Sequence, residues 1–184
     1  MTGTRKKQIL AIAVAAVLVV GWWVVTPRFL LKSFRIPTGS MSPTLPIGSG
    51  VFVRPTKDVH VSDIAVFHFP NTPKVWNVYR IVAGEGDTVE IREKHLFVNG
   101  TEKNEPYVVH EDPVVYPNQP ALPEPYRSRD WYGPYRVPAD SWFLLGDNRD
   151  RSFDSRYRGV VPRELIFGRV VFVIRPNGSF SRPR

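Results

Sequence analysis

The hydrophobic residues after residue 34 occur in short runs separated by turn-forming residues, and this pattern restricts the chain to a mainly β fold. The runs are rich in β-branched and aromatic residues, as strands are, and cover residues 51–53, 64–67, 75–82, 88–91 and 96–98, with a last one near 168–174. Turn signals lie at 47–50, 70–73, 84–87 and 99–100. No helical period of ten or more residues occurs after residue 34. We therefore expect a small antiparallel β-sheet or barrel-like domain.

Two local patterns add detail to this expectation. The segment Asn71-Thr72-Pro73 predicts a hairpin that joins strands at 64–69 and 74–82. Residues 163–167 are consistent with a short helix or a turn. We therefore assign residues 34–184 to one β-rich domain.

Residues 103–135 interrupt the strand pattern with seven prolines and several tyrosines. Proline cannot donate a hydrogen bond to a strand ladder, so this segment is predicted to be an extended insertion packed on the surface. A polyproline ligand for a partner protein is the alternative interpretation.

An uncharged apolar run covers residues 9–25 near the N-terminus. Seventeen residues in a helix span roughly 25 Å, which is close to a bilayer core of about 30 Å. Basic residues precede the run, and Trp22 and Trp23 lie near its end, where membrane helices carry aromatic residues. Residues 1–33 are therefore predicted to form a transmembrane anchor with a juxtamembrane segment.

A cleaved signal peptide is the alternative for the same run. The run is longer than the apolar core of a usual signal peptide, and the bulky and basic sequence after Val25 offers no cleavage site with small residues. Basic residues on the two sides nearly balance, so charge alone leaves the orientation in the membrane open.

Composition excludes several other functions. The formal net charge is +8, but no run of five or six basic residues occurs, so anionic lipid headgroups are a better partner than nucleic acid. The absence of cysteine excludes a disulfide framework, a thiolate metal site and a cysteine nucleophile. The four histidines lack close ligand spacing. We expect neither a metal nor a cofactor.

Two polar stretches are candidates for chemistry. In the first, PTGSMSPTL at 37–45, Ser40 follows a glycine in a Pro-bounded turn, where it could be an exposed nucleophile or part of an ordinary loop. The second, GDNRDRSFDSR at 146–156, follows a strand-like FLLG. It is either a solvated charged loop or a buried polar network that braces a site.

Both stretches resemble conserved boxes of the type I signal peptidase family, in the same order. FRIPTGSMSPTL resembles the nucleophile box, VSDIAVFHFP the box of the next strand, and VYRIVAGEGDTVEI the box of the general base. GDNRDRSFDSRYRG followed by VPRELIFGR resembles the last box. The matches cover residues 34–100 and 136–175. The resemblance implies a membrane-bound serine endopeptidase that removes signal peptides from secreted preproteins.

The resemblance also implies roles for individual residues. Ser40 matches the nucleophile, Thr38 the residue that helps form the oxyanion hole, and Ser152 the serine that hydrogen-bonds the base. Asp154 and Arg156 match a bracing ion pair, and Asp147 is a further supporting residue. The positions that match the shallow apolar substrate pockets are Phe34, Ile36, Pro37, Met41, Leu45 and Val78.

The resemblance further implies where the protein acts and on what. The domain after a single membrane crossing would lie on the periplasmic or extracellular side of the plasma (inner) membrane. Its partners would be the lipid bilayer and the signal peptides of exported preproteins, cleaved after small residues at −1 and −3. A maturation protease of a conjugation or pilus system shares these boxes and is a variant of this interpretation.

Tyr79 departs from the family, which has a lysine base directly before the arginine matched by Arg80. Burial can lower the pKa of a lysine until it accepts a proton, whereas a phenol has a pKa near 10 and is a donor at pH 7. Lys74 lies five residues earlier, roughly 16 Å along an extended strand and on its opposite face, so we do not expect it to substitute. His68 has no feature that favours it as the base, and a group from a neighbouring chain is also open.

Three interpretations follow from this departure. The protein is an active enzyme with an unconventional or impaired base, an inactive homologue that binds signal peptides, or an unrelated structural β-domain. The family boxes disfavour the third. Retention of the other matched residues favours the first over the second.

Overall fold

The computed structural model describes residues 12–16, 21, 31–123 and 128–183. The chain divides into two compact units, Met1–Leu31 and Lys32–Arg184. Residues 12–16 and Gly21 are helical, but the rest of the predicted anchor at 9–25 lies outside the described residues. Within the described ranges no helix is both long and apolar enough to cross a membrane. The transmembrane anchor thus stays a prediction.

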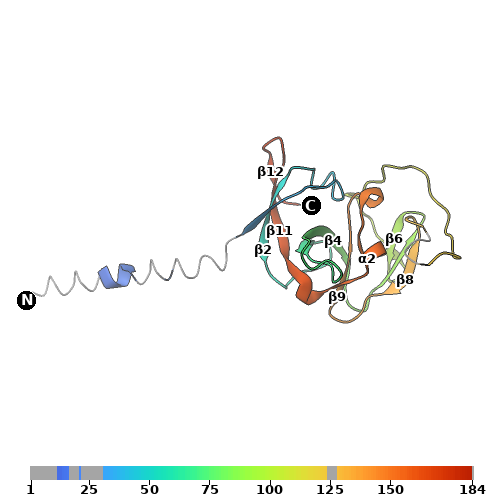
Figure 1. Ribbon diagram of the computed structural model, residues 1–184, viewed down its shortest axis with the longest axis horizontal. Coiled ribbons are helices and arrows are strands. Elements are labelled where there is room, and N and C mark those ends of the chain that lie inside the picture. Colours follow the sequence, from blue (N-terminus) through green and yellow to red (C-terminus); the bar gives the residue numbers. More distant parts are fainter. Residues whose placement is uncertain (1–11, 17–20, 22–30, 124–127, 184) are drawn as a thin grey trace, which may run out of the picture. The chain divides into compact units, whose positions relative to one another are not determined.

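The second unit is mainly β, as the sequence predicts, and its larger sheet is antiparallel. The strand order is β1-β2-β11-β3-β4-β9-β10, and β12 pairs with β11 (Figure 1). These strands are β1 (Lys32–Arg35), β2 (Gly50–Pro55), β3 (Ile64–Phe67), β4 (Asn77–Ala83), β9 (Ser141–Leu145), β10 (Val161–Pro162), β11 (Ile166–Ile174) and β12 (Phe180–Ser181).

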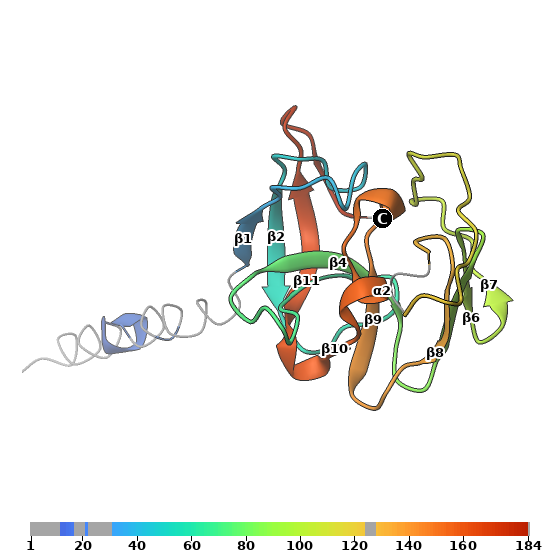
Figure 2. The same cartoon turned by 45° about the vertical axis from the view of Figure 1, so that its right-hand side comes forward.

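A smaller antiparallel sheet has the order β7-β6-β5-β8. Its strands are β5 (Thr88–Arg92), β6 (His95–Val98), β7 (Thr101–Glu102) and β8 (Tyr132–Arg136). Three short helical segments complete the described elements: the 3₁₀ helices η1 (Arg149–Arg151) and η2 (Arg163–Leu165), and the α-helix α2 (Ser155–Arg158). In Figure 2, β9 and α2 lie between β11 and the strands β6 and β8.

The hairpin predicted around residues 71–73 is present, since β3 and β4 pair with Ala65 opposite Tyr79. The second strand starts later than expected, at Asn77 instead of residue 74 or 75. The Val75 carbonyl is used by side chains, at 2.8 Å from His68 Nδ1 and 2.9 Å from Asn77 Nδ2, and therefore does not enter the ladder. Lys74 consequently lies in the exposed turn and not on the strand.

Strands β4 and β9 join two hydrophobic cores. Trp142 and Leu144 of β9 belong to the core under the larger sheet, whereas Phe143 and Leu145 belong to the core beside the smaller sheet. This division follows from the period of two residues in a strand. The polar loop at 146–156 directly follows β9. It therefore begins where the two cores meet.

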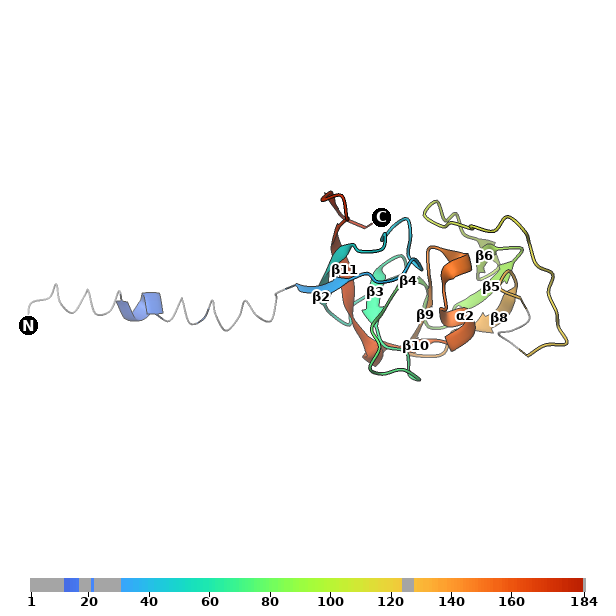
Figure 3. The same ribbon diagram turned by 45° about the horizontal axis from the view of Figure 1, so that its top comes forward.

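The Pro-rich segment joins β7 to β8, and its yellow part lies beside the smaller sheet (Figure 3). Between residue 103 and residue 131 its described residues form turns and a single isolated bridge. The last residues of the predicted insertion differ, because Tyr132–Arg136 form β8. Pro134 is tolerated there because β8 is an edge strand that pairs with β5 alone.

Candidate active site

Ser40 lies in the turn between β1 and β2, and the polar loop at 146–156 fixes its backbone. The Asn148 amide donates to the Ser40 carbonyl at 3.0 Å. The Ser40 side chain is nearly buried, and its Oγ lies 3.2 Å from Thr38 Oγ1. Sequence reasoning left open whether Ser40 is an exposed nucleophile or part of an ordinary loop. The structure places Ser40 in a constrained, largely desolvated position.

Apolar residues that follow Ser40 attach the turn to the core. Met41 and Leu45 are 1% and 0% exposed, and both belong to the core under the larger sheet. The Met41 sulfur also accepts the Asp147 amide at 3.4 Å. Because the core and the polar loop both hold the turn, Ser40 has little freedom to shift.

Tyr79 projects from β4 towards the same point. Its hydroxyl lies 3.4 Å from the Phe153 carbonyl, and its ring packs against Phe67 and Phe69 with centroids 5.9 Å and 6.3 Å away. Burial and then the charge of Asp154 raise its pKa, whereas the nearby hydroxyls of Ser152 and Ser40 act in the opposite direction. The phenol is therefore neutral at pH 7 and acts as a hydrogen-bond donor.

Ser152 follows η1 and is buried next to Ser40. Among the described residues its Oγ has no hydrogen bond of regular geometry. A β-carbon on Gly146 would lie 2.2 Å from Ser152 Oγ and 2.6 Å from the Ser40 carbonyl oxygen. Only a glycine at position 146 permits this approach of the two serines.

Asp154 and Arg156 form a buried ion pair beside Ser152. Arg156 Nε and Nη2 lie 2.9 Å from the two Asp154 oxygens, and the side chains are 4% and 0% exposed. Asp154 also accepts the Gly146 amide at 3.1 Å and the Arg156 amide at 3.2 Å, the latter at the start of α2. The polar loop is thus a hydrogen-bonded network and not a solvated surface run.

Asp147 holds three parts of the site together. Arg80 Nε and Nη2 donate to its two oxygens at 2.9 Å and 2.7 Å, and Thr44 Oγ1 donates at 2.6 Å. Both charged side chains are at most 2% exposed. Sequence reasoning gave no role to Thr44 or to Arg80 in this pair. A charged residue inside the otherwise apolar run VYRIVA was the available signal for Arg80.

The residues predicted to line substrate pockets differ in exposure. Ile36, Met41 and Leu45 are buried core residues with at most 4% exposed surface, so they can support a substrate surface only from beneath. Phe34 and Val78 are half-buried, and Pro37 is exposed. The Phe34 ring packs against Trp76 at 5.3 Å and Phe167 at 5.7 Å. Contact of these six residues with a substrate stays a prediction.

A buried serine beside a second hydroxyl and a braced loop is an arrangement that a serine hydrolase can use. The family described as signal peptidase, peptidase S26, matches residues 5–175. This match covers most of the chain, which therefore belongs to that family.

Individual relatives agree with this assignment. Signal peptidase I of Bacillus amyloliquefaciens is 32% identical over 186 residues, which cover 98% of this chain and 96% of that protein. Probable signal peptidase I-2 of Synechocystis sp. is 33% identical over 150 residues, or 77% of this chain and 62% of that protein. Thylakoidal processing peptidase 1 of Arabidopsis thaliana is 36% identical over 166 residues, or 83% of this chain. The chain thus spans 96%, 62% and 44% of these three relatives, in the order given.

Proposed function

We propose that this protein is a membrane-bound serine endopeptidase that removes signal peptides from exported preproteins, with Ser40 as nucleophile. The observation that carries the proposal is that Ser40, Tyr79 and Ser152 are buried close together, with the exposed Thr38 within hydrogen-bond reach of Ser40. Membership of the signal peptidase S26 family supports the substrate class.

In the proposed reaction, Ser40 Oγ attacks the scissile carbonyl and forms an acyl-enzyme that water then hydrolyses. The Thr38 hydroxyl is 3.2 Å from Ser40 Oγ and is the candidate donor to the oxyanion. The attack releases the Ser40 proton, which a base must accept. Tyr79 is the titratable side chain next to Ser40 in the family's base position.

As a base, Tyr79 is weak near neutral pH. Because burial raises its pKa, only a small fraction of the protein carries the phenolate that can accept a proton. Thr38, Ser40 and the braced loop remain in place, and such groups sustain residual catalysis when a base is lost. We therefore propose slow cleavage at pH 7 that becomes faster in alkaline solution.

A signal-peptide-binding protein without protease activity is the second candidate. The neutral state of Tyr79, which leaves Ser40 without a strong base, favours it. Both candidates use the same surface and the same partners. They differ in whether a Ser40 ester forms.

Residues 1–33 are proposed to anchor the protein in the plasma (inner) membrane by a single crossing. Residues 34–184 would then lie on the periplasmic or extracellular side, where preproteins emerge. The apolar run at 9–25 supports this arrangement. Signal peptides and the bilayer are the proposed partners.

The deciding experiment incubates the purified full chain with a preprotein that carries a cleavable signal peptide. We expect a single cut after small residues at −1 and −3, and no cut with Ser40→Ala. Equal cleavage by the wild type and Ser40→Ala would refute Ser40 as nucleophile. Binding of the preprotein without any cleavage from pH 7 to pH 10 would select the binding-only candidate.

A further inference from the structure

Residues 105–112 of the Pro-rich segment run beside residues 146–151 of the loop that carries Ser152. The Val109 amide donates to the Asp147 carbonyl at 2.9 Å, and the Arg149 amide donates to the Val109 carbonyl at 3.1 Å. Val109 and Asn148 form an isolated parallel bridge. The segment is therefore bound to the loop through its backbone.

Glu105 adds a buried charge to this contact. Its Oε1 accepts Arg149 Nη2 at 2.7 Å and the Tyr107 hydroxyl at 3.1 Å. The side chains of Arg149 and Glu105 are only 3% and 8% exposed. Without the carboxylate, a buried guanidinium would lose the counter-ion that compensates its desolvation.

Arg149 connects Glu105 to the backbone around the two serines. Its Nε donates to the Gly146 carbonyl at 3.1 Å. The Gly146 α-carbon packs against Ser152 and the Ser40 carbonyl, which also accepts the Asn148 amide. A shift of Arg149 would therefore move the backbone that sets the distance between Ser40 and Ser152.

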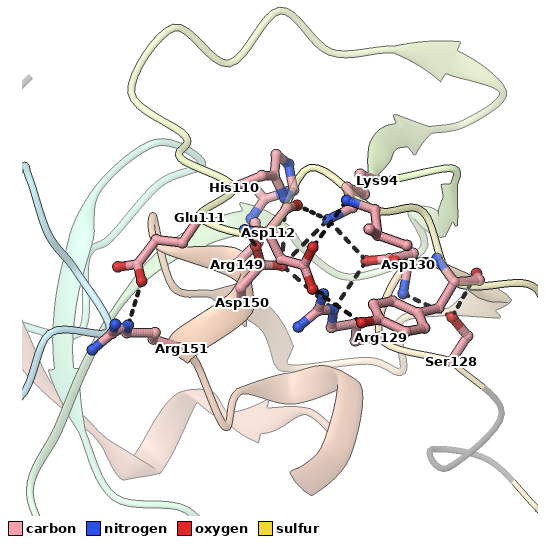
Figure 4. A network of polar contacts seen from close by, with 12 residues as sticks. Lys94, His110, Glu111, Asp112, Ser128, Arg129, Asp130, Arg149, Asp150 and Arg151 are labelled. Carbon is pink, nitrogen blue, oxygen red and sulfur yellow. Dashed lines mark hydrogen bonds and ion pairs between the residues drawn. The ribbon is translucent and has the colours of Figure 1, made fainter.

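Figure 4 shows a second attachment, at the other end of the segment and centred on Asp150. Asp150 Oδ2 accepts the Asp112 amide at 2.9 Å. Its Oδ1 lies 3.6 Å from both Lys94 Nζ and Arg129 Nε. Residues 105–112 are thus attached to the loop at both ends. Glu105 is therefore held in place beside Arg149.

Tyr107 extends the contact to the strand that carries Tyr79. The Arg80 guanidinium lies 3.8 Å from the centre of the Tyr107 ring, and Arg80 also pairs with Asp147. Glu105 and Tyr107 thus contact the side chains of Arg149 and Arg80, and Val109 contacts the backbone of the loop that carries Ser152.

We propose that Glu105 is a positioning residue of the active site, which acts through Arg149 to hold the backbone of residues 146–148 and thereby the spacing of Ser40 and Ser152. The kinetic part of its test rests on the proposed protease function. Glu105 does not touch the reacting atoms. If Glu105 has this positioning role, its loss should loosen the backbone locally at Asn148. Loss of a residue that only supports the fold would loosen the whole domain.

The test compares Glu105→Gln with Glu102→Gln in the full chain. Glu102 lies on β7, is half exposed and pairs with His95, so its substitution is the matched control. In Glu105→Gln we expect amide hydrogen exchange at Asn148 to accelerate at least about tenfold while β11 amides keep their rates, as for a local opening. We expect kcat to fall at least about tenfold at nearly constant KM, because attack geometry is lost and not binding.

A milder variant keeps the test decisive if Glu105→Gln does not fold. Tyr107→Phe removes the hydroxyl that donates to Glu105 but keeps the ring on Arg80, and we expect a smaller acceleration at Asn148. Unchanged exchange at Asn148, or an equal acceleration at Asn148 and in β11, would overturn the proposal. If the wild type cleaves no preprotein, the proposed protease function fails, and the exchange rates still decide the role of Glu105.

Discussion

Tyr79, which is predicted to take the place of the general base, has a side chain that holds its proton at neutral pH. Burial and the charge of Asp154 raise its pKa, so the phenol donates at neutral pH. The nearby Ser152 Oγ has no hydrogen bond of regular geometry within the described residues, although it contributes to the pKa of Tyr79. A small change of chemistry at this position should therefore have a large effect on rate.

We predict that Tyr79→Lys raises signal-peptide cleavage near pH 7 by at least about tenfold, since a well-placed base contributes 10² to 10⁴ in rate. Burial beside Phe67 and Phe69 should lower the pKa of the new amine and leave part of it neutral. Initial rates of preprotein cleavage give the measurement, and Tyr79→Phe is the control. Efficient wild-type cleavage that Tyr79→Phe leaves unchanged would assign the base to another group.

The pH dependence of the wild type provides a separate prediction. A base must be deprotonated to act, and a raised pKa moves that deprotonation to higher pH. We expect kcat/KM to rise with pH through about pH 10, the ordinary pKa of a phenol, without a plateau below it. Tyr79→Lys should reach its plateau at lower pH. A wild-type plateau near pH 7 would contradict the assignment of Tyr79.

At the scale of residues, the sequence predicted which single residues lie at the candidate site better than it predicted the contacts between them. Resemblance pointed to Ser40, Thr38 and Ser152, and these lie around one point with Tyr79. The pair of Arg80 with Asp147 was missed, because the two residues are 67 positions apart and no local period connects them. Gly146 was missed as well, since the close approach it permits exists only in the folded chain.

At the scale of elements, the polar loop depends on one buried ion pair. We predict that Arg156→Ala lowers the free energy of unfolding by about 3–5 kcal/mol, because it leaves the Asp154 charge buried without its partner. Urea unfolding measures this change. Arg151→Ala is the matched control: Arg151 lies on the same loop but is 65% exposed, so about 0.5 kcal/mol or less is expected. An equally small effect of Arg156→Ala would mean that the pair carries little stability.

The strands were predictable because burial on a pleated sheet leaves a local pattern. Runs at 51–53, 64–67, 88–91 and 96–98 all lie within strands. The start of β4 was set two or three residues too early, because side chains of His68 and Asn77 occupy the Val75 carbonyl. The contacts of the Pro-rich segment were not predictable, since the partners of Glu105 and Asp112 lie about 40 positions away.

At the scale of the whole molecule, the Asp150 carboxylate, which holds the Pro-rich segment, makes the stability of the protein depend on pH. Burial acts to raise the pKa of Asp150, but the Asp112 amide and the charges of Arg129 and Lys94 lower it below its ordinary 3.8. A lowered folded-state pKa stabilises the protein above the unfolded value and loses this contribution as pH falls through the folded value.

We therefore predict that the thermal unfolding midpoint is independent of Asp150 titration near pH 7 and falls on acidification below about pH 4. Asp150→Asn should lower the midpoint at pH 7 and weaken its dependence on pH in the acid range. Scanning calorimetry at a series of pH values provides the measurement. An acid dependence identical in the wild type and Asp150→Asn would show that other groups cause it.

The N-terminal apolar run at 9–25 is predicted to determine where the whole molecule works. Its seventeen uncharged residues are long enough to cross a bilayer with slight local thinning, and no small-residue cleavage site follows them. We predict that the mature protein keeps residues 1–25, stays with membranes during an alkaline carbonate wash, and exposes residues after 34 to protease added outside the cytoplasm.

Leu18→Arg is the matched variant, because a charge at the centre of a membrane helix costs about 2.5–3.5 kcal/mol of insertion free energy. It should release a larger fraction of the protein into the wash. A mature N-terminus beyond residue 25 would instead identify the run as a cleaved signal peptide.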